Sequence, residues 1–198
     1  LEFRRVLFRS KNSAVGGTYI FNNAISDNVV NIYNGANVKF GTGYQPDGTT
    51  SYGRVTNNTV TISGSNVSID TQDNNIRNTQ LGATFRINNP IALAIDASLS
   101  NPSADTISAS SITAGANSII ISAINLLSGE GANQIDILLT DNDILKTAYV
   151  LSDDILSNIT MSDGVNYVVN SVDYDNTTGI LTFNYAPDSS SSSDKIGR

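Results

Sequence analysis

The sequence of 198 residues predicts an all-β protein, and within that class a right-handed parallel β-helix (β-solenoid) with a C-terminal β-hairpin cap. Apolar and polar residues alternate in short runs separated by Asn, Ser, Gly and Asp, which is typical of short strands. Isoleucines also recur every 25 or 26 residues, in the series Ile62, Ile87, Ile112 and the series Ile69, Ile95, Ile121. Stacked coils need such a period to bring equivalent apolar positions back into register.

The expected strands of the coiled region each hold two apolar residues that flank a third residue. They are Tyr19/Phe21, Val30/Ile32, Val38/Phe40, Val60/Ile62, Val67/Ile69, Phe85/Ile87, Leu93/Ile95 and Ile119/Ile121. A β-sandwich remains the alternative, because its strands also follow one another at roughly 8–12 residues. A sandwich gives no reason for the longer recurrence, so we favour the solenoid. Its right hand follows from the general chirality of parallel crossovers.

Asparagine pairs mark the expected corners between these strands. The pairs are Asn22–Asn23, Asn57–Asn58, Asn74–Asn75 and Asn88–Asn89. Asn tolerates left-handed backbone and hydrogen-bonds its neighbours, so it suits a tight corner and can form a ladder from one coil to the next.

After Leu127 the pattern changes. Residues 134–140 predict a strand, and residues 141–149 and 152–158 each predict a short helical turn, with Asp141 or Ser152 as the N-cap.

A hairpin is expected near the C-terminal end. Residues 167–174 and 180–185 read as strands that flank Asp175-Asn176-Thr177-Thr178-Gly179, a strong turn signal. Pairing against the last coil would protect its open strand edge.

The two ends differ in character from the rest of the chain. Residues 1–10 resemble a translated sequencing adapter over all ten positions, and residues 195–198 resemble the same kind of sequence. We therefore expect neither end to contribute to the fold. The expected segments are a non-native leader (1–10), the solenoid (11–127), the solenoid end with its hairpin cap (128–186), and a Ser-rich linker with an adapter-like tail (187–198).

Composition excludes several classes of function. The chain has no His and no Cys, which excludes a Ser-His-Asp or Cys-His triad, the usual zinc sites and any disulfide. Residues 11–194 carry 6 basic and 17 acidic side chains, the opposite of what nucleic-acid binding requires. No run of 18 or more apolar residues is present, so no helix is expected to span a membrane.

Three segments give the chain a family resemblance. Residues 104–112, 119–127 and 172–183 resemble the passenger region of a Gram-negative autotransporter (type V secretion) of the adhesin type, built on a right-handed parallel β-helix. The resemblance implies a non-enzymatic, surface-exposed passenger fragment, an adhesin or a stalk, that is exported through the outer membrane. A downstream barrel domain, missing from this fragment, would provide its only membrane contact.

The resemblance also sets the expected partners. These are host or matrix glycans or proteins, with no nucleic acid, and the chain is expected to be a monomer. The absence of Cys fits export through a narrow pore, which a disulfide would obstruct. A carbohydrate-active β-helix enzyme, a polysaccharide lyase or hydrolase, is the alternative function.

No catalytic, cofactor-binding or metal-binding residue is predicted, and no cofactor. Asp173 and Asp175 could form a carboxylate pair, but we favour a turn role for Asp175. The acidic groups at 141–143 and 153–154 could bind calcium, although neither has an EF-hand spacing, and helix capping is favoured.

Three further groups of residues have a simple structural interpretation. Residues 41–44 lack the third Gly and the Lys of a phosphate loop. A lyase would need basic side chains clustered on one face, for which the candidates are Lys39, Arg54, Arg77 and Arg86. An adhesive or sugar-stacking face could involve Tyr19, Tyr33, Tyr44 and Tyr52, but half-buried positions at solenoid corners are favoured.

Overall fold

The computed structural model describes most of the chain from Thr84 onward and short segments before it. The described residues are 13–15, 18–21, 25–26, 29–32, 37–40, 42–44, 50–52, 55–56, 59–62, 66–72, 74, 76, 78–80, 84–129, 133–162 and 164–188. Before Thr61 the description is confined to the backbone. The two adapter-like ends lie outside the described residues.

Strands dominate the structure, so the predicted all-β class is confirmed. One parallel sheet has five strands, in the spatial order β1 (Ser13–Val15), β4 (Val29–Ile32), β9 (Thr59–Ile62), β12 (Thr84–Ile87) and β16 (Ser111–Thr113). All four pairings in it join strands from successive passes of the chain.

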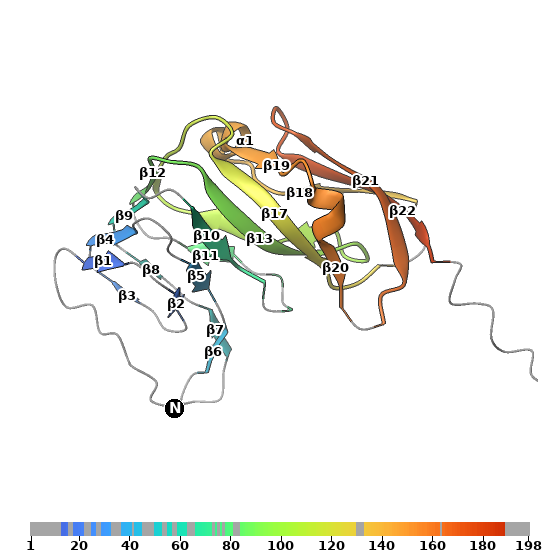
Figure 1. The fold of residues 1–198 in the computed structure, drawn as a ribbon, viewed down its shortest axis with the longest axis horizontal. Helices are drawn as coiled ribbons and strands as arrows, with labels where there is room; N and C mark the ends of the chain where they lie inside the picture. Colours follow the sequence, from blue (N-terminus) through green and yellow to red (C-terminus); the bar gives the residue numbers. More distant parts are fainter. Residues whose placement is uncertain are drawn as a thin grey trace, which may run out of the picture.

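The second sheet has eight strands and contains the longest parallel strands of the molecule. Its main path is β2 (Thr18–Phe21), β5 (Asn37–Phe40), β10 (Val67–Asp70), β13 (Ile91–Ser98), β17 (Ile119–Leu126) and β19 (Tyr149–Leu151). In addition, β20 (Ile159–Met161) pairs in parallel with β17, and β14 (Ser103–Ala104) pairs in antiparallel fashion with β13. Figure 1 shows β10, β13 and β17 side by side near the centre of the molecule.

Three small sheets have two strands each. The pairs β3 (Ile25–Ser26) with β8 (Val55–Thr56) and β11 (Asn78–Gln80) with β15 (Thr106–Ser108) are parallel. The pair β6 (Thr42–Tyr44) with β7 (Thr50–Tyr52) is antiparallel.

The register of the five-stranded sheet corrects one of the predicted Ile series. Ile62 lies opposite Ile87, as predicted, but Ile112 lies opposite Phe85. The pass from β12 to β16 is longer because β13 has eight residues and then turns back to pair with β14. The resulting offset is two residues, which keeps Ile112 on the same face as Ile87 because side chains alternate with period two. All three isoleucines are buried.

The second Ile series is also corrected. Ile69 lies opposite Leu93, and Leu93 lies opposite Ile121, so Ile95 is not in that row. A bulge between Leu93 and Ala94 shifts the pairing, and Ile95 lies opposite Ile124. Bulges place an extra residue in one strand, so a constant interval in the sequence does not guarantee a constant register.

The core lies between the sheets and continues into the C-terminal cap. Phe85, Ile119, Ile121, Ile124 and Leu126 have fully buried side chains. Leu181, Phe183 and Tyr185 of the cap belong to the same apolar cluster. Burial therefore joins the parallel sheets and the cap in one core.

The corners confirm part of the Asn prediction. Asn74 adopts a left-handed backbone with a φ of 64°, as do Asn66 and Asn117, whereas Asn88 and Asn89 do not. A side-chain ladder also forms, because the Nδ2 atom of Asn125 donates to Oδ1 of Asp96 (3.0 Å) and to Oδ1 of Asn74 (3.3 Å). The other Asn pairs lie outside the described residues.

Both predicted helical turns are present, but both predicted caps are wrong. The helix α1 (Asp143–Ala148) begins after Asn142, whose Oδ1 accepts hydrogen bonds from the amides of Ile144 and Leu145, both at 3.0 Å. The 3-10 helix η1 (Ile155–Asn158) follows Asp154 and has no side-chain cap. The Ser152 hydroxyl hydrogen-bonds the Asp154 carboxylate instead of a helix amide.

The predicted hairpin is confirmed as β21 (Tyr167–Asp175) and β22 (Ile180–Pro187). It does not extend a parallel sheet: β22 pairs on its other side with β18 (Gln134–Leu138), which gives a separate antiparallel sheet of three strands (Figure 1). This cap contacts the parallel sheet through side chains, including the edge-to-face rings of Tyr149 and Tyr174, whose centroids lie 6.2 Å apart. The expected pairing of the hairpin with the open strand edge is therefore wrong.

Candidate functional site

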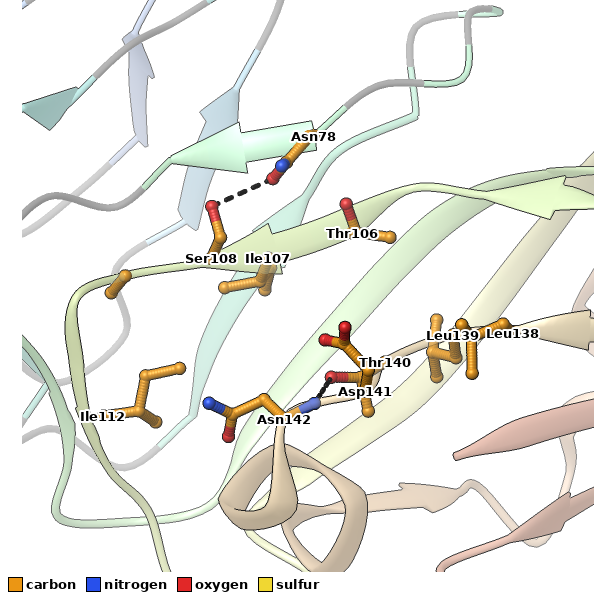
Figure 2. A pocket seen from close by; sticks show the side chains of 11 residues that line it. Asn78, Thr106, Ile107, Ser108, Ile112, Leu138, Leu139, Thr140, Asp141 and Asn142 are labelled. Atoms are coloured by element: carbon orange, nitrogen blue, oxygen red, sulfur yellow. Dashed lines mark hydrogen bonds between the residues drawn. The ribbon is translucent and has the colours of Figure 1, made fainter. Parts of the chain in front are cut away.

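A cleft of about 400 Å³ lies between β15 and the loop that joins β18 to α1. Its lining residues come from β11, from β15 and the turn after it, from β16, and from that loop (Figure 2). They are Asn78, Thr106, Ile107, Ser108, Ala109, Ile112, Leu138, Leu139, Thr140, Asp141 and Asn142. The cleft thus lies where the parallel sheets meet the C-terminal cap.

One wall is the small parallel sheet of β11 and β15. Alternation along β15 buries Ile107 and leaves Thr106 and Ser108 half-buried. The Ser108 hydroxyl donates to Oδ1 of Asn78 at 3.1 Å, which fixes the Asn78 amide and leaves its Nδ2 available as a donor. Ile107 and Ile112 supply the apolar surface of this wall.

The other wall is the loop of residues 139–142. The Asn142 amide donates to the Thr140 hydroxyl at 3.1 Å, while Oδ1 of Asn142 caps α1. The cap leaves Nδ2 of Asn142 without a hydrogen-bond partner among the described residues. Figure 2 shows Asp141 pointing from this loop toward β15, with Asn142 beside it.

The turn of the hairpin holds this loop in place. The amides of Leu139 and Thr140 donate to the Gly179 carbonyl at 2.8 and 3.4 Å. Gly179 has a φ of +75°, and a Cβ atom there would lie 2.0 Å from the Thr140 carbonyl oxygen. Only glycine permits both the left-handed backbone and this close approach.

The cleft exists because the chain leaves β15 without a second parallel neighbour. In the described part of the chain, β15 pairs only with β11. The chain that follows β17 enters β18 and α1 instead of adding a third strand to this small sheet. The space beside β15 is bordered by the loop rather than filled by a strand.

The lining carries one acidic side chain, Asp141, and no basic one. Asp141 is exposed, and its carboxylate has no hydrogen-bond partner among the described residues. The whole chain has a formal net charge of −7. Charge therefore disfavours an anionic ligand in this cleft and leaves neutral or cationic ones.

A second polar group lies at a corner of the eight-stranded sheet. Asp96 and Asp105 are both buried. Oδ2 of Asp105 accepts from the Asp96 amide (2.8 Å) and the Thr71 hydroxyl (3.1 Å), and Oδ2 of Asp96 accepts from the Asn74 amide (3.1 Å). These bonds link neighbouring passes of the chain, so the two carboxylates have a structural role.

The structure places the predicted acidic candidates in turns and caps. Oδ1 of Asp175 accepts from the Thr177 amide at 2.8 Å, and this bond lowers the pKa of the Asp175 carboxyl. Asp173 is exposed on β21. The favoured turn role of Asp175 is confirmed.

The two candidate calcium groups form local contacts. Asp143 pairs with Lys146 one turn along α1, with Nζ and Oδ1 3.2 Å apart. Hydrogen bonds from the side chains of Ser152 and Asn158 lower the pKa of the Asp154 carboxyl. Among the residues that the structure describes, no three potential metal ligands gather.

Most of the remaining candidates lie where side chains are not described. This applies to the side chains of Lys39, Arg54 and Arg77, to the segment 41–44, and to the four tyrosines at 19, 33, 44 and 52. Arg86 is exposed on β12.

The sequence analysis did not identify the cleft. It considered Asp141 and its neighbours only as caps or calcium ligands, and it missed Asn78, Thr106 and Ser108. One signal was present: a failed N-cap at Asp141 frees its carboxylate, because the next residue, Asn142, is an equally good cap.

Comparison of the chain with known protein families, with curated proteins and with solved structures finds no match. In the part of the chain that the structure describes, none of the helices has the length and apolar character needed to cross a bilayer. Function is therefore inferred from the architecture and from the chemistry of the cleft.

Proposed function

We propose that the chain is a right-handed parallel β-helix that serves as a non-enzymatic, surface-exposed adhesin or stalk, the passenger fragment of an autotransporter. The observation that carries the proposal is the repeating order in which the chain visits its parallel sheets. From β9 onward it visits the five-stranded sheet, the eight-stranded sheet and a small sheet in turn.

The registers support this interpretation. Val60 lies opposite Phe85, and Phe85 lies opposite Ile112, which are passes of 25 and 27 residues. Ile69, Leu93 and Ile121 give passes of 24 and 28 residues in the other large sheet. A chain that returns to the same three sheets at nearly constant intervals winds as a solenoid, since each coil contacts only its neighbours.

Location at the cell surface is the second part of the proposal. It is supported by the family resemblance, by the absence of Cys and by the separate antiparallel cap at the C-terminal end. A cap of this kind covers apolar side chains that the last coil cannot bury alone.

The experiment that tests the surface role starts from the reading frame after Ser193. A run of alternating strands that predicts an outer-membrane barrel is expected there, and the intact gene, expressed in a Gram-negative host, should display residues 11–194 to protease on whole cells. A stop codon shortly after Ser193, or protection from protease until the cells are lysed, would contradict the proposal.

A carbohydrate-active enzyme remains the second candidate, because the cleft holds an exposed carboxylate at Asp141. Purified protein would then release products from polysaccharides, and Asp141→Asn would abolish that release. Unchanged product size by chromatography after long incubation would exclude this candidate for the polysaccharides tested.

A further inference from the structure

We infer that the cleft between β15 and residues 139–142 binds a neutral carbohydrate unit of one or two sugar rings. This inference rests on the proposed function, because an adhesive module needs a ligand, and it assigns that ligand to one place. Four features of the cleft lead to it: paired hydrogen-bonding groups, an apolar surface, the sign of the charge and the size.

The first feature is the pair formed by Asp141 and Asn142. Asp141 offers carboxylate oxygens that only accept, and Asn142 offers an Nδ2 that only donates, since its Oδ1 is engaged by the amides of Ile144 and Leu145. Two neighbouring hydroxyls can satisfy such a pair at once: one donates to the carboxylate and the other accepts from the amide. Adjacent hydroxyls of this kind are characteristic of sugars.

The opposite wall continues the same chemistry. Nδ2 of Asn78 is a free donor because its Oδ1 accepts from Ser108, and the Thr106 hydroxyl can donate or accept. Between these polar groups lie Ile107 and Ile112 (Figure 2). Their apolar surface can pack against the C–H groups of a sugar ring while the ring hydroxyls reach the polar walls.

Charge and size narrow the ligand further. The lining has an acidic side chain and no basic one, so uronic acids, sialic acids and phosphorylated sugars would meet repulsion without a compensating cation. The volume of about 400 Å³ lies low in the range of small-molecule sites, about 300–1,000 Å³. A monosaccharide or disaccharide suits this space better than a longer chain.

The test is saturation-transfer NMR and titration on the purified full chain. The probes are lactose, cellobiose and N,N′-diacetylchitobiose, with sialyllactose as the anionic counterpart of lactose and the tripeptide Lys-Ser-Lys as a cationic alternative. We expect saturable binding of at least one neutral disaccharide. Sialyllactose should bind at least ten times more weakly than lactose, and the tripeptide should not bind.

Matched variants assign the binding to the cleft. Asn142→Asp keeps an oxygen that can cap α1 but removes the Nδ2 donor, so affinity should fall at least tenfold while the fold is retained. Thr106→Val, which keeps the shape of the side chain, should also weaken binding. Asp143→Asn changes a charge in the same segment outside the cleft, and it should leave the affinity unchanged.

Three outcomes would overturn the inference: no neutral disaccharide binds, binding is insensitive to Asn142→Asp and Thr106→Val, or the tripeptide binds in place of the sugars. Because the measurement uses purified protein, it does not depend on cell-surface display. Sugar binding by a chain that is not displayed would leave the inference standing and contradict the proposed function. Display without sugar binding would do the reverse.

Discussion

At the residue scale, the core depends on β-branched side chains that stack from strand to strand. Ile121 is fully buried and lies between Leu93 on β13 and Leu151 on β19. A side chain with packed neighbours on both sides cannot be truncated without leaving a cavity, because adjacent strands are held by their backbone hydrogen bonds.

We predict that Ile121→Ala lowers the free energy of unfolding by roughly 2–5 kcal/mol. Urea titration followed by circular dichroism measures this loss. Leu156→Ala is the matched control, because that side chain is half exposed and its truncation should cost well under about 1 kcal/mol. Equal losses in the two variants would show that Ile121 does not occupy a packed core.

A second residue-scale prediction concerns acid sensitivity at Asp175. Its pKa is lowered in the folded state, chiefly by the Thr177 amide. Its stabilising contribution is therefore present above the unfolded pKa of about 4 and is lost as the pH falls through the lower folded value.

The variants Asp175→Ala and Asp175→Asn test this directly. The alanine variant should be less stable than the native chain at pH 7, and the difference should shrink below pH 4. Asn keeps an oxygen that can accept from the Thr177 amide but does not titrate, so its variant should lose less stability on acidification than the native chain. Urea midpoints at pH 7 and pH 3 give the comparison, and equal acid sensitivity in all three proteins would contradict it.

Residue identities predicted the corners better than the register. Asn74 was predicted at a corner and adopts the left-handed backbone expected of Asn. The position of Ile112 opposite Phe85 could not be predicted, because it depends on the length of an intervening turn and on which residues bulge. Neither property leaves a periodic signal in the sequence.

At the element scale, the hairpin turn is a joint between the cap and the cleft. We predict that Gly179→Ala destabilises the fold by roughly 2–5 kcal/mol, because a clash with the Thr140 carbonyl adds to the strain of a positive φ. Gly164 also has a positive φ, but open space surrounds its Cβ position, so Gly164→Ala should cost only about 1 kcal/mol.

Chemical denaturation of the two glycine variants separates backbone strain from the clash. If Gly164→Ala and Gly179→Ala cost the same, the contact between the turn and residues 139–142 does not contribute to stability. A larger cost at Gly179 should be accompanied by NMR shift changes at Leu139 and Thr140, whose amides donate to its carbonyl.

Element existence was readable from local signals, whereas the cleft was not. The turn sequence at 175–179 and its flanking alternation predicted β21 and β22. The cleft brings together residues of β11 and of the loop after β18, which are some 60 positions apart in the sequence. It forms because a strand is absent from the small sheet, and the sequence of the lining residues does not indicate that absence.

At the scale of the whole molecule, stability should increase toward the C-terminal half. β17 has β13 on one side and β19 and β20 on the other, and its Ile119, Ile121 and Ile124 are fully buried. The family resemblance implies the same direction, since a chain that emerges from the cell without ATP would fold from its C-terminal end.

Hydrogen exchange tests this order. We predict that amides of residues 118–126 exchange more slowly than those of residues 17–40. Measurement on the full chain by mass spectrometry is sufficient, because the two segments fall in separate peptides. Slower exchange in residues 17–40 would contradict a C-terminal stable core, whatever the fold.

The position of β22 has a mechanical consequence. It is the middle strand of the cap, paired with β18 on one side and β21 on the other. If the molecule is tethered to a cell beyond Pro187 and loaded through a ligand, tension enters along this strand. Both rows of its hydrogen bonds then bear the load in shear, and they must break together rather than one at a time.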